Sequence, residues 1–182
     1  MSDTPAPKHY SPRWRTDARV DPPTTGDERA MLVEFLDWHR ATFELKCTGL
    51  RVDQYSERPI SPSGISPHGL LRHLAGAERW WFRIQFAGES VPLLYYSDAD
   101  PDQDFEDLGG DPREAMRVWH EECRRSRDIV AAAPSLDAEG TRKSTGEPFS
   151  LRWLLIRMIA EYARHNGHAD LLRERLDGAT GV

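Results

Sequence analysis

The part of the sequence that most constrains the fold is a long amphipathic stretch from Phe149 to Gly178, whose apolar row contains polar side chains. Alternating steps of four and three residues keep one stripe of a helix facing its neighbour. Burying a polar group without a partner costs about 2–7 kcal/mol, so polar residues in such a row need partners. A bound metal would supply them, and so would hydrogen bonds within a helical bundle. The stripe reads Leu154, Met158, Glu161, His165, His168 and Leu172.

The sequence contains three further amphipathic stretches, and residues that typically start or stop helices lie at several ends of the four. Ser66-Pro67 and Asp111-Pro112 each pair a capping residue with proline at the first helical position, and Asp177-Gly178 is a favourable helix end. Four helices of roughly 20–28 residues predict an all-α fold, a four-helix bundle with long connections. The expected helices cover residues 26–50, 67–87, 112–133 and 150–177.

The domain organisation follows from the same pattern. Residues 1–25 contain five prolines and little apolar periodicity, which predicts an irregular N-terminal arm. Residues 26–182 then form the bundle domain around one core. The expected core row of the first helix is Met31, Phe35, Trp38, Thr42 and Leu45, and that of the second is Leu70, His73, Ala77, Trp80 and Ile84.

Composition excludes several classes of function. The net charge of -6 gives no positive surface for nucleic acid. No apolar run approaches the roughly 20 residues that a membrane span needs, and the N-terminus lacks the apolar segment of a signal peptide. Cys47 and Cys123 are the only cysteines, which favours a reducing cytoplasm. In the apolar row of its helix, Cys123 is typical of an inert buried thiol.

Two connections carry patterns of their own. Residues 89–111 contain eight aspartates and glutamates, but counting from Asp98 puts Gln103 and Gly109 where an EF-hand needs glycine and glutamate. We therefore expect a solvated acidic loop rather than a calcium site. Residues 135–148 are polar and contain glycine, and could include a short extended pair.

The chemistry centres on Glu161 and His165, which are four residues apart and so point from successive turns toward one spot. His73, from another helix, could complete a set of two imidazoles and one carboxylate. Such a set matches a catalytic zinc site with an open position, although iron would also suit it. A di-iron carboxylate site is excluded because the candidate glutamates lack histidine three residues on.

A purely structural role for these polar residues stays open as an alternative to the metal site. Arg157 lies one turn before Glu161 and could occupy the carboxylate through an ion pair worth a few tenths of a kcal/mol. His168 could be a third imidazole, an outer hydrogen-bond donor or a plain polar contact. Asp170 is a second candidate for an outer or proton-handling role, and His39 is typical of a structural or surface histidine.

Two motifs resemble the DinB-like superfamily of metal-binding four-helix bundles. They are H-L-A-G-A-E-R-W-W, starting at His73, and E-Y-A-R-H-N-G-H-A-D-L-L-R-E, starting at Glu161. The chain resembles a largely uncharacterised branch and is similar to mycothiol-dependent maleylpyruvate isomerase, over most of its length from the first helix to Gly178. The resemblance implies the metal ligands His73, Glu161 and His165. Glutamate at 161 favours the mycothiol-dependent branch, whereas Arg157 stands where some relatives carry histidine.

What the resemblance implies for function is thiol transfer. A divalent metal, zinc before iron or nickel, would bind a low-molecular-weight thiol such as mycothiol or bacillithiol, and the thiolate would attack an electrophilic substrate. Two other classes remain open: a non-catalytic metal-binding or stress-associated bundle, and a metal-dependent hydrolase that uses bound water. The expected partners are small molecules, with no nucleic acid or membrane, and a homodimer is left open.

Overall fold

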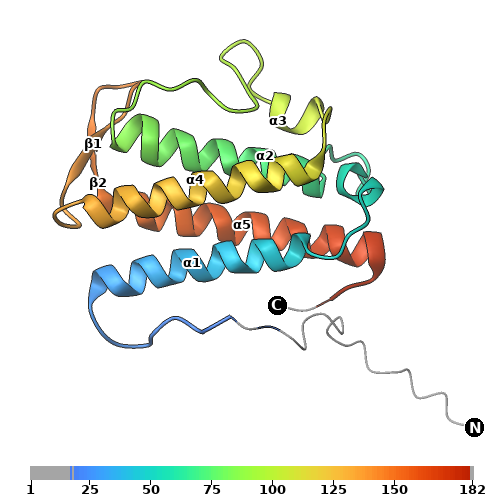
Figure 1. Cartoon of the computed structure of the whole chain (residues 1–182), viewed down its shortest axis with the longest axis horizontal. Coiled ribbons are helices and arrows are strands. Elements are labelled where there is room, and N and C mark those ends of the chain that lie inside the picture. The colour runs from blue at the N-terminus through green and yellow to red at the C-terminus, as the bar shows by residue number, and fades with distance from the viewer. Residues whose placement is uncertain (1–16, 18, 181–182) are drawn as a thin grey trace, which may run out of the picture.

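The computed structural model describes residue 17 and residues 19–180. Four long helices lie side by side (Figure 1), and they confirm the predicted four-helix bundle. They are α1 (Glu28–Cys47), α2 (Pro67–Glu78) with its π-helical continuation η3 (Arg79–Phe86), α4 (Pro112–Ala132) and α5 (Leu151–Asp177). Short elements lie in the connections: η2 (Asp53–Ser56), α3 (Gln103–Glu106), and the antiparallel strands β1 (Glu139–Thr141) and β2 (Pro148–Ser150).

The helix boundaries follow from side chains that cap exposed backbone N–H groups. Ser66 accepts from the Gly69 N–H before α2, and Ser150 accepts from the Trp153 N–H before α5. Asp27 and Asp111 cap α1 and α4 in the same way. Gly178 ends α5 at φ 72°, a left-handed conformation that favours glycine. Local capping chemistry therefore fixes where each long helix begins, within two residues of the predicted positions.

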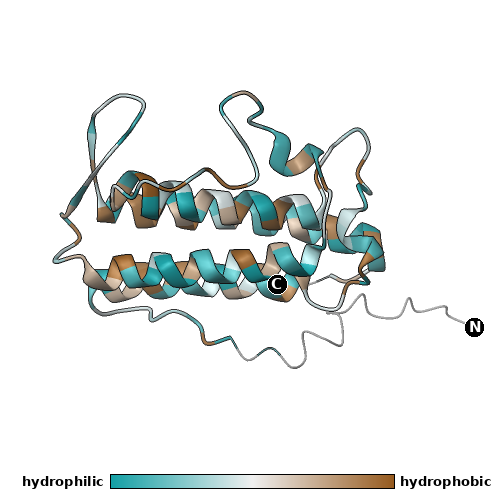
Figure 2. Cartoon of the chain, turned by 45° about the horizontal axis from the view of Figure 1, so that its top comes forward, coloured by the Kyte–Doolittle hydropathy of each residue, from teal (hydrophilic) through white to brown (hydrophobic). Residues whose placement is uncertain are grey.

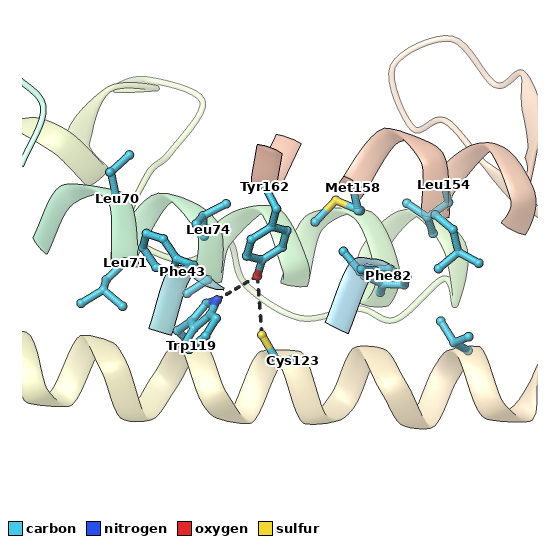
Figure 3. Close-up of a cluster of buried hydrophobic side chains, with 14 of the residues drawn as sticks. Phe43, Leu70, Leu71, Leu74, Phe82, Trp119, Cys123, Leu154, Met158 and Tyr162 are labelled. Carbon is cyan, nitrogen blue, oxygen red and sulfur yellow. Dashed lines mark hydrogen bonds between the residues drawn. The ribbon is translucent and has the colours of Figure 1, made fainter. Parts of the chain in front are cut away.

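The bundle consists of two helix pairs, because α1 packs chiefly on α5 and α2 chiefly on α4. Hydrophilic and hydrophobic residues are interspersed along each long helix (Figure 2), as expected for helices with one buried face. Figure 3 shows the shared core, in which side chains from all four helices meet. Its fully buried members include Phe43, Leu70, Leu71, Leu74, Phe82, Trp119, Leu154, Met158 and Tyr162.

The predicted core row of α1 is wrong by one residue over most of its length. Phe35 is 43% exposed, whereas Leu36 is 1% exposed. The buried row continues through Arg40 and Phe43 to Cys47, and of the predicted row only Thr42 is buried. A search for apolar residues at helical spacing passes over this row because it contains a buried arginine.

The predicted position of His73 in the core row of α2 also needs correction. The fully buried side of α2 and η3 carries Leu74, Glu78 and Phe82 at four-residue spacing. His73 lies at the edge of that side, with 27% of its side chain exposed. By contrast, the row predicted for α5 is buried from Leu154 to Leu172 except at the half-buried His168.

The remaining predictions concern the connections and the arm. Seven of the eight acidic residues from 89 to 111 are exposed or half-buried, as expected for a solvated loop, but Asp104 in α3 is only 3% exposed. The irregular arm predicted for residues 1–25 lies mostly outside the described residues. Among the helices at residues 19–180, none is apolar over enough of its length to cross a membrane.

Candidate metal centre

The structure brings His73, Glu161 and His165 together between α2 and α5. The Nε2 atoms of both histidines lie 3.2 Å from Oε1 of Glu161. One ligand-competent atom from each residue lies within 4.8 Å of the other two. Two imidazole nitrogens and one carboxylate oxygen therefore face a common point, which is a donor set that suits a divalent metal.

Asp104, which the sequence analysis assigned to a solvated loop, contacts this group from outside. Its Oδ2 lies 2.8 Å from Nδ1 of His73, on the opposite side of the ring from Glu161. A carboxylate at Nδ1 fixes the ring orientation and leaves Nε2 facing inward. Phe105, the next residue, packs on the His73 ring with 5.1 Å between the ring centroids. An apolar residue beside Asp104 is the only sign in the sequence that this part of the acidic connection is anchored, and it is a weak one.

The outer oxygen of Glu161 is occupied by the arginine one turn earlier. Nη1 of Arg157 donates to Oε2 of Glu161 over 2.5 Å, so the predicted ion pair is present. It engages only Oε2 and leaves Oε1 to the two histidines. The ion pair and the three-residue group therefore coexist, because they use different oxygens of one carboxylate.

His168 and Asp170 were both considered for outer roles, and the structure separates them. Nδ1 of His168 lies 3.3 Å from Nδ1 of His165, on the side of that ring away from Glu161. Asp170 instead forms an ion pair with Lys46 of α1. Five residues after His165 correspond to about 140° around a helix, which turns Asp170 away from the group.

The charges within the group are strongly coupled. Burial lowers the pKa of His73, but hydrogen bonds to Asp104 and Glu161 outweigh it and raise that pKa to about 9. Hydrogen bonds from His165 and His73 hold the pKa of Glu161 far below its usual range. Burial lowers the pKa of His168. Without a metal, the group therefore binds a proton on His73 at neutral pH.

A second polar cluster lies in the core and was missed by the sequence analysis. Arg40 donates to both oxygens of Glu78 over 2.8 and 2.7 Å, and Tyr162 donates to Oε1 of Glu78 over 2.7 Å. Trp119 donates to the Tyr162 hydroxyl over 2.8 Å, and the Cys123 thiol lies beside it (Figure 3). Burial raises the pKa of Cys123, which agrees with an inert thiol rather than a nucleophile. We call these five residues the closed network.

His39, the remaining histidine weighed from the sequence, lies away from the metal group. Its Nδ1 is 3.3 Å from Nδ2 of Asn166, which also donates to the His39 carbonyl. Burial lowers the pKa of His39. This contact joins α1 to α5 and agrees with the structural interpretation.

Comparisons with known proteins agree with the fold. A family model described as mycothiol-S-transferase matches residues 31–178. YfiT from Bacillus subtilis, described as a probable metal-dependent hydrolase with an unusual four-helix bundle topology, has a similar structure, with a TM-score of 0.60. The two chains are 14% identical, and the match covers 86% of this chain and 93% of YfiT. No curated protein matches the sequence.

Proposed function

Because the chain belongs to the mycothiol S-transferase family, a group of DinB-like helical bundles, we propose that it is a metal-dependent thiol S-transferase. In this proposal His73, Glu161 and His165 hold a divalent metal. The observation that carries it is the convergence of their three inner atoms within 4.8 Å. The outer atoms of the same side chains already have partners, so the inner atoms are the ones left for a ligand.

The donor set fits zinc before other metals. Two neutral imidazoles and one carboxylate form a three-residue site with an open position, as in catalytic zinc centres. Iron or nickel would also accept these ligands, so the donor chemistry ranks the metals without excluding them. Binding would require His73 to lose its proton, because a protonated imidazole cannot coordinate.

The open position would admit the thiol. His73 is 27% exposed at its side chain, so the group is accessible from the edge of the bundle between α2 and α5. When bound, a divalent metal lowers the pKa of a coordinated thiol and so supplies a thiolate nucleophile at neutral pH. The proposed partners are a low-molecular-weight thiol of the mycothiol or bacillithiol type and an electrophilic substrate.

The protein's own contribution is to orient the ligands. Asp104 would keep Nε2 of His73 facing inward, and His168 would accept from Nδ1–H of His165 and leave its Nε2 as the ligand atom. Arg157 would neutralise the outer oxygen of Glu161 and favour coordination through Oε1 alone. These three contacts involve atoms that point away from the common centre, so they support the site without blocking it.

A hydrolase is the second candidate, because YfiT shares the fold and is described as a probable metal-dependent hydrolase. In that case bound water would take the open position in place of a thiol. The two candidates differ in one measurable requirement, since a transferase turns over only when thiol is present. A non-catalytic metal-binding bundle would turn over in neither condition.

The test combines metal analysis with a thiol-dependent assay. Purified protein, loaded with zinc, is assayed with 1-chloro-2,4-dinitrobenzene in the presence of mycothiol or bacillithiol and without thiol. We expect bound zinc and thiol-dependent conjugation, both lost in His165→Ala and both retained in His120→Ala, which alters an exposed histidine of α4. A wild-type protein that retains neither zinc, iron nor nickel would end the metalloenzyme proposal.

A further inference from the structure

A group of aromatic and cationic side chains lies beside the candidate metal centre. Trp81 of η3 and Trp153 of α5 have ring centroids 5.5 Å apart, and Phe149 packs against both. Cζ of Arg157 lies 5.6 Å from the Trp81 ring, and Cζ of Arg142 lies 4.7 Å from the Trp153 ring. We call Trp81, Trp153, Arg142 and Arg157 the arginine–tryptophan cluster.

The two arginines retain hydrogen-bonding capacity. A guanidinium that stacks on an aromatic ring keeps its N–H donors in its own plane, free for another group. In the part of the chain that the structure describes, no carboxylate pairs with Arg142, and Arg157 bonds only to Glu161, through Nη1. Arg124 of α4, by contrast, pairs with both Glu121 and Asp128.

The cluster is continuous with the metal centre. Trp81 lies eight residues, about two helical turns, beyond His73 on the continuous helix formed by α2 and η3. Ala77, which is half-buried and small, lies midway between them. On α5, Arg157 touches both regions, because it bonds to Glu161 and stacks on Trp81.

We propose that the arginine–tryptophan cluster binds a carboxylate of the ligand whose reacting end lies at the metal centre. The planar guanidinium fork matches a carboxylate, and such charge-assisted hydrogen bonds are about twice as strong as neutral ones. The chain has a net charge of -6, so the Arg142 charge and the remaining N–H donors of Arg157 favour acids locally. The inference rests on the proposed function, which it deepens by naming an acidic ligand about two helical turns (~11 Å) long.

The first experiment tests the cluster without any thiol. Hexanoate and its neutral counterpart hexanol are titrated into the purified protein, and the indole N–H signals of Trp81 and Trp153 are followed by NMR after assignment with Trp→Phe variants. We expect hexanoate, but not hexanol, to shift both signals. Arg142→Ala should weaken hexanoate binding by about tenfold or more. Arg164→Ala removes an exposed positive charge beyond Glu161 in the opposite direction and should leave binding unchanged.

The second experiment adds the metal. On protein loaded with cobalt(II), the thiolate absorption band reports the Kd of 6-mercaptohexanoate and of 6-mercaptohexanol. The acid should bind about tenfold more tightly, and the ratio of the two Kd values should fall to about one in Arg142→Ala and persist in Arg164→Ala.

To find which reactant carries the carboxylate, turnover of 4-chloro-3-nitrobenzoate is compared with turnover of its amide, with 6-mercaptohexanol as the thiol in both cases. A preference for the benzoate that Arg142→Ala removes assigns the carboxylate to the electrophile, and equal turnover together with tighter binding of 6-mercaptohexanoate assigns it to the thiol.

The outcomes separate the two proposals. Failure of hexanoate to shift the indole signals overturns the carboxylate site. Hexanoate binding with equal Kd values for the two thiols, and no benzoate preference, overturns its placement beside the reacting atoms. Hexanoate binding without a thiolate band for either thiol supports the carboxylate site and refutes the proposed thiol transfer.

Discussion

Two polar clusters begin at neighbouring residues of α5 and differ in how completely the protein satisfies them. Tyr162 belongs to the closed network, where the Glu78 side chain is 0% exposed and both of its oxygens accept hydrogen bonds. Glu161 belongs to the candidate metal centre, where His73 is 27% exposed at its side chain. A buried polar residue in a helical row is therefore compatible with either a structural or a chemical role.

The balance of charge distinguishes the two clusters. In the closed network Arg40 pairs with Glu78, and the adjacent Asp37 is shared by Arg40 and Arg127, so positive and negative charges balance. The hydroxyl and indole groups complete the remaining contacts. In the metal centre two carboxylates, Glu161 and Asp104, face one arginine and two imidazoles, and His73 has to be protonated to balance them. A divalent ion would supply the same positive charge. The metal centre thus depends on something from solution, whereas the closed network does not.

The largest expected effect is the loss of stability on opening the closed network. Glu78→Ala leaves the buried Arg40 with only the half-buried Asp37 as an acidic partner, and breaking a buried pair costs about 3–5 kcal/mol. Urea unfolding should show this loss, with metal content per folded molecule unchanged. Glu121→Ala, which removes an exposed carboxylate of α4, should cost less than about 1 kcal/mol. A loss of metal in Glu78→Ala that remains well folded would show that the clusters are coupled.

The converse change removes the metal and spares most of the stability. Glu161→Gln exchanges the carboxylate for an amide, which is a weak ligand. We expect zinc affinity to fall by more than about 100-fold, because loss of a residue that only orients a ligand already costs about 10–100-fold. Elemental analysis and melting with and without EDTA would measure this. EDTA should lower the melting temperature of the wild type but not that of Glu161→Gln, since a metal stabilises the state that binds it. Glu174→Gln, at an exposed position of the same helix, serves as the control. Unchanged zinc affinity in Glu161→Gln would remove this residue from the site.

A smaller effect is expected at Asp104, which acts through His73. Asp104→Ala frees the imidazole ring, and zinc affinity should fall by about 10–100-fold. Asp104→Asn, whose amide oxygen can still accept from Nδ1–H, should recover part of that loss. Asp102→Ala changes an exposed acid two residues earlier and should bind zinc as the wild type does. Equal zinc affinity in all three variants would show that Asp104 has no positioning role.

The comparison also shows what the sequence could predict. The helices were predictable because caps such as Ser66 and Ser150 act on backbone N–H groups within three residues. The spacing of Glu161 and His165 placed both on one stripe, and the motif around His73 indicated the second helix. Each of these inferences uses contacts within one helix or a pattern that extends over a whole helix.

What could not be predicted depends on partners distant in sequence. Arg40 occupies the buried row of α1 only because Glu78 of α2 pairs with it, so a pattern of apolar residues selects the wrong row. Asp104 is one of eight acids in its connection, and only its contact with His73 singles it out. The same restriction explains why His73 was assigned to the core row rather than to its edge.

The smallest expected effect, and the sharpest contrast, is the pH dependence of stability in the metal-free protein. The pKa of His73 rises from 6.5 to about 9 on folding. A raised pKa stabilises the folded state fully below pH 6.5, and that stabilisation is lost as pH rises through 9. We expect the free energy of unfolding to fall by about 1–3 kcal/mol across this window. In zinc-loaded protein the proton is already displaced, so this decrease should be absent.

The closed network should respond at the other end of the pH scale. Although burial raises the pKa of Glu78, Arg40 outweighs it and lowers that pKa below 4.5 on folding, so its stabilisation is present above pH 4.5 and is lost in acid. Urea unfolding of metal-free His73→Gln should therefore lack the alkaline decrease and keep the acidic one, whereas His120→Gln should keep both. If His73→Gln showed an alkaline decrease of the same size, the decrease would come from other groups. His73 would then not carry the proton that a metal has to replace.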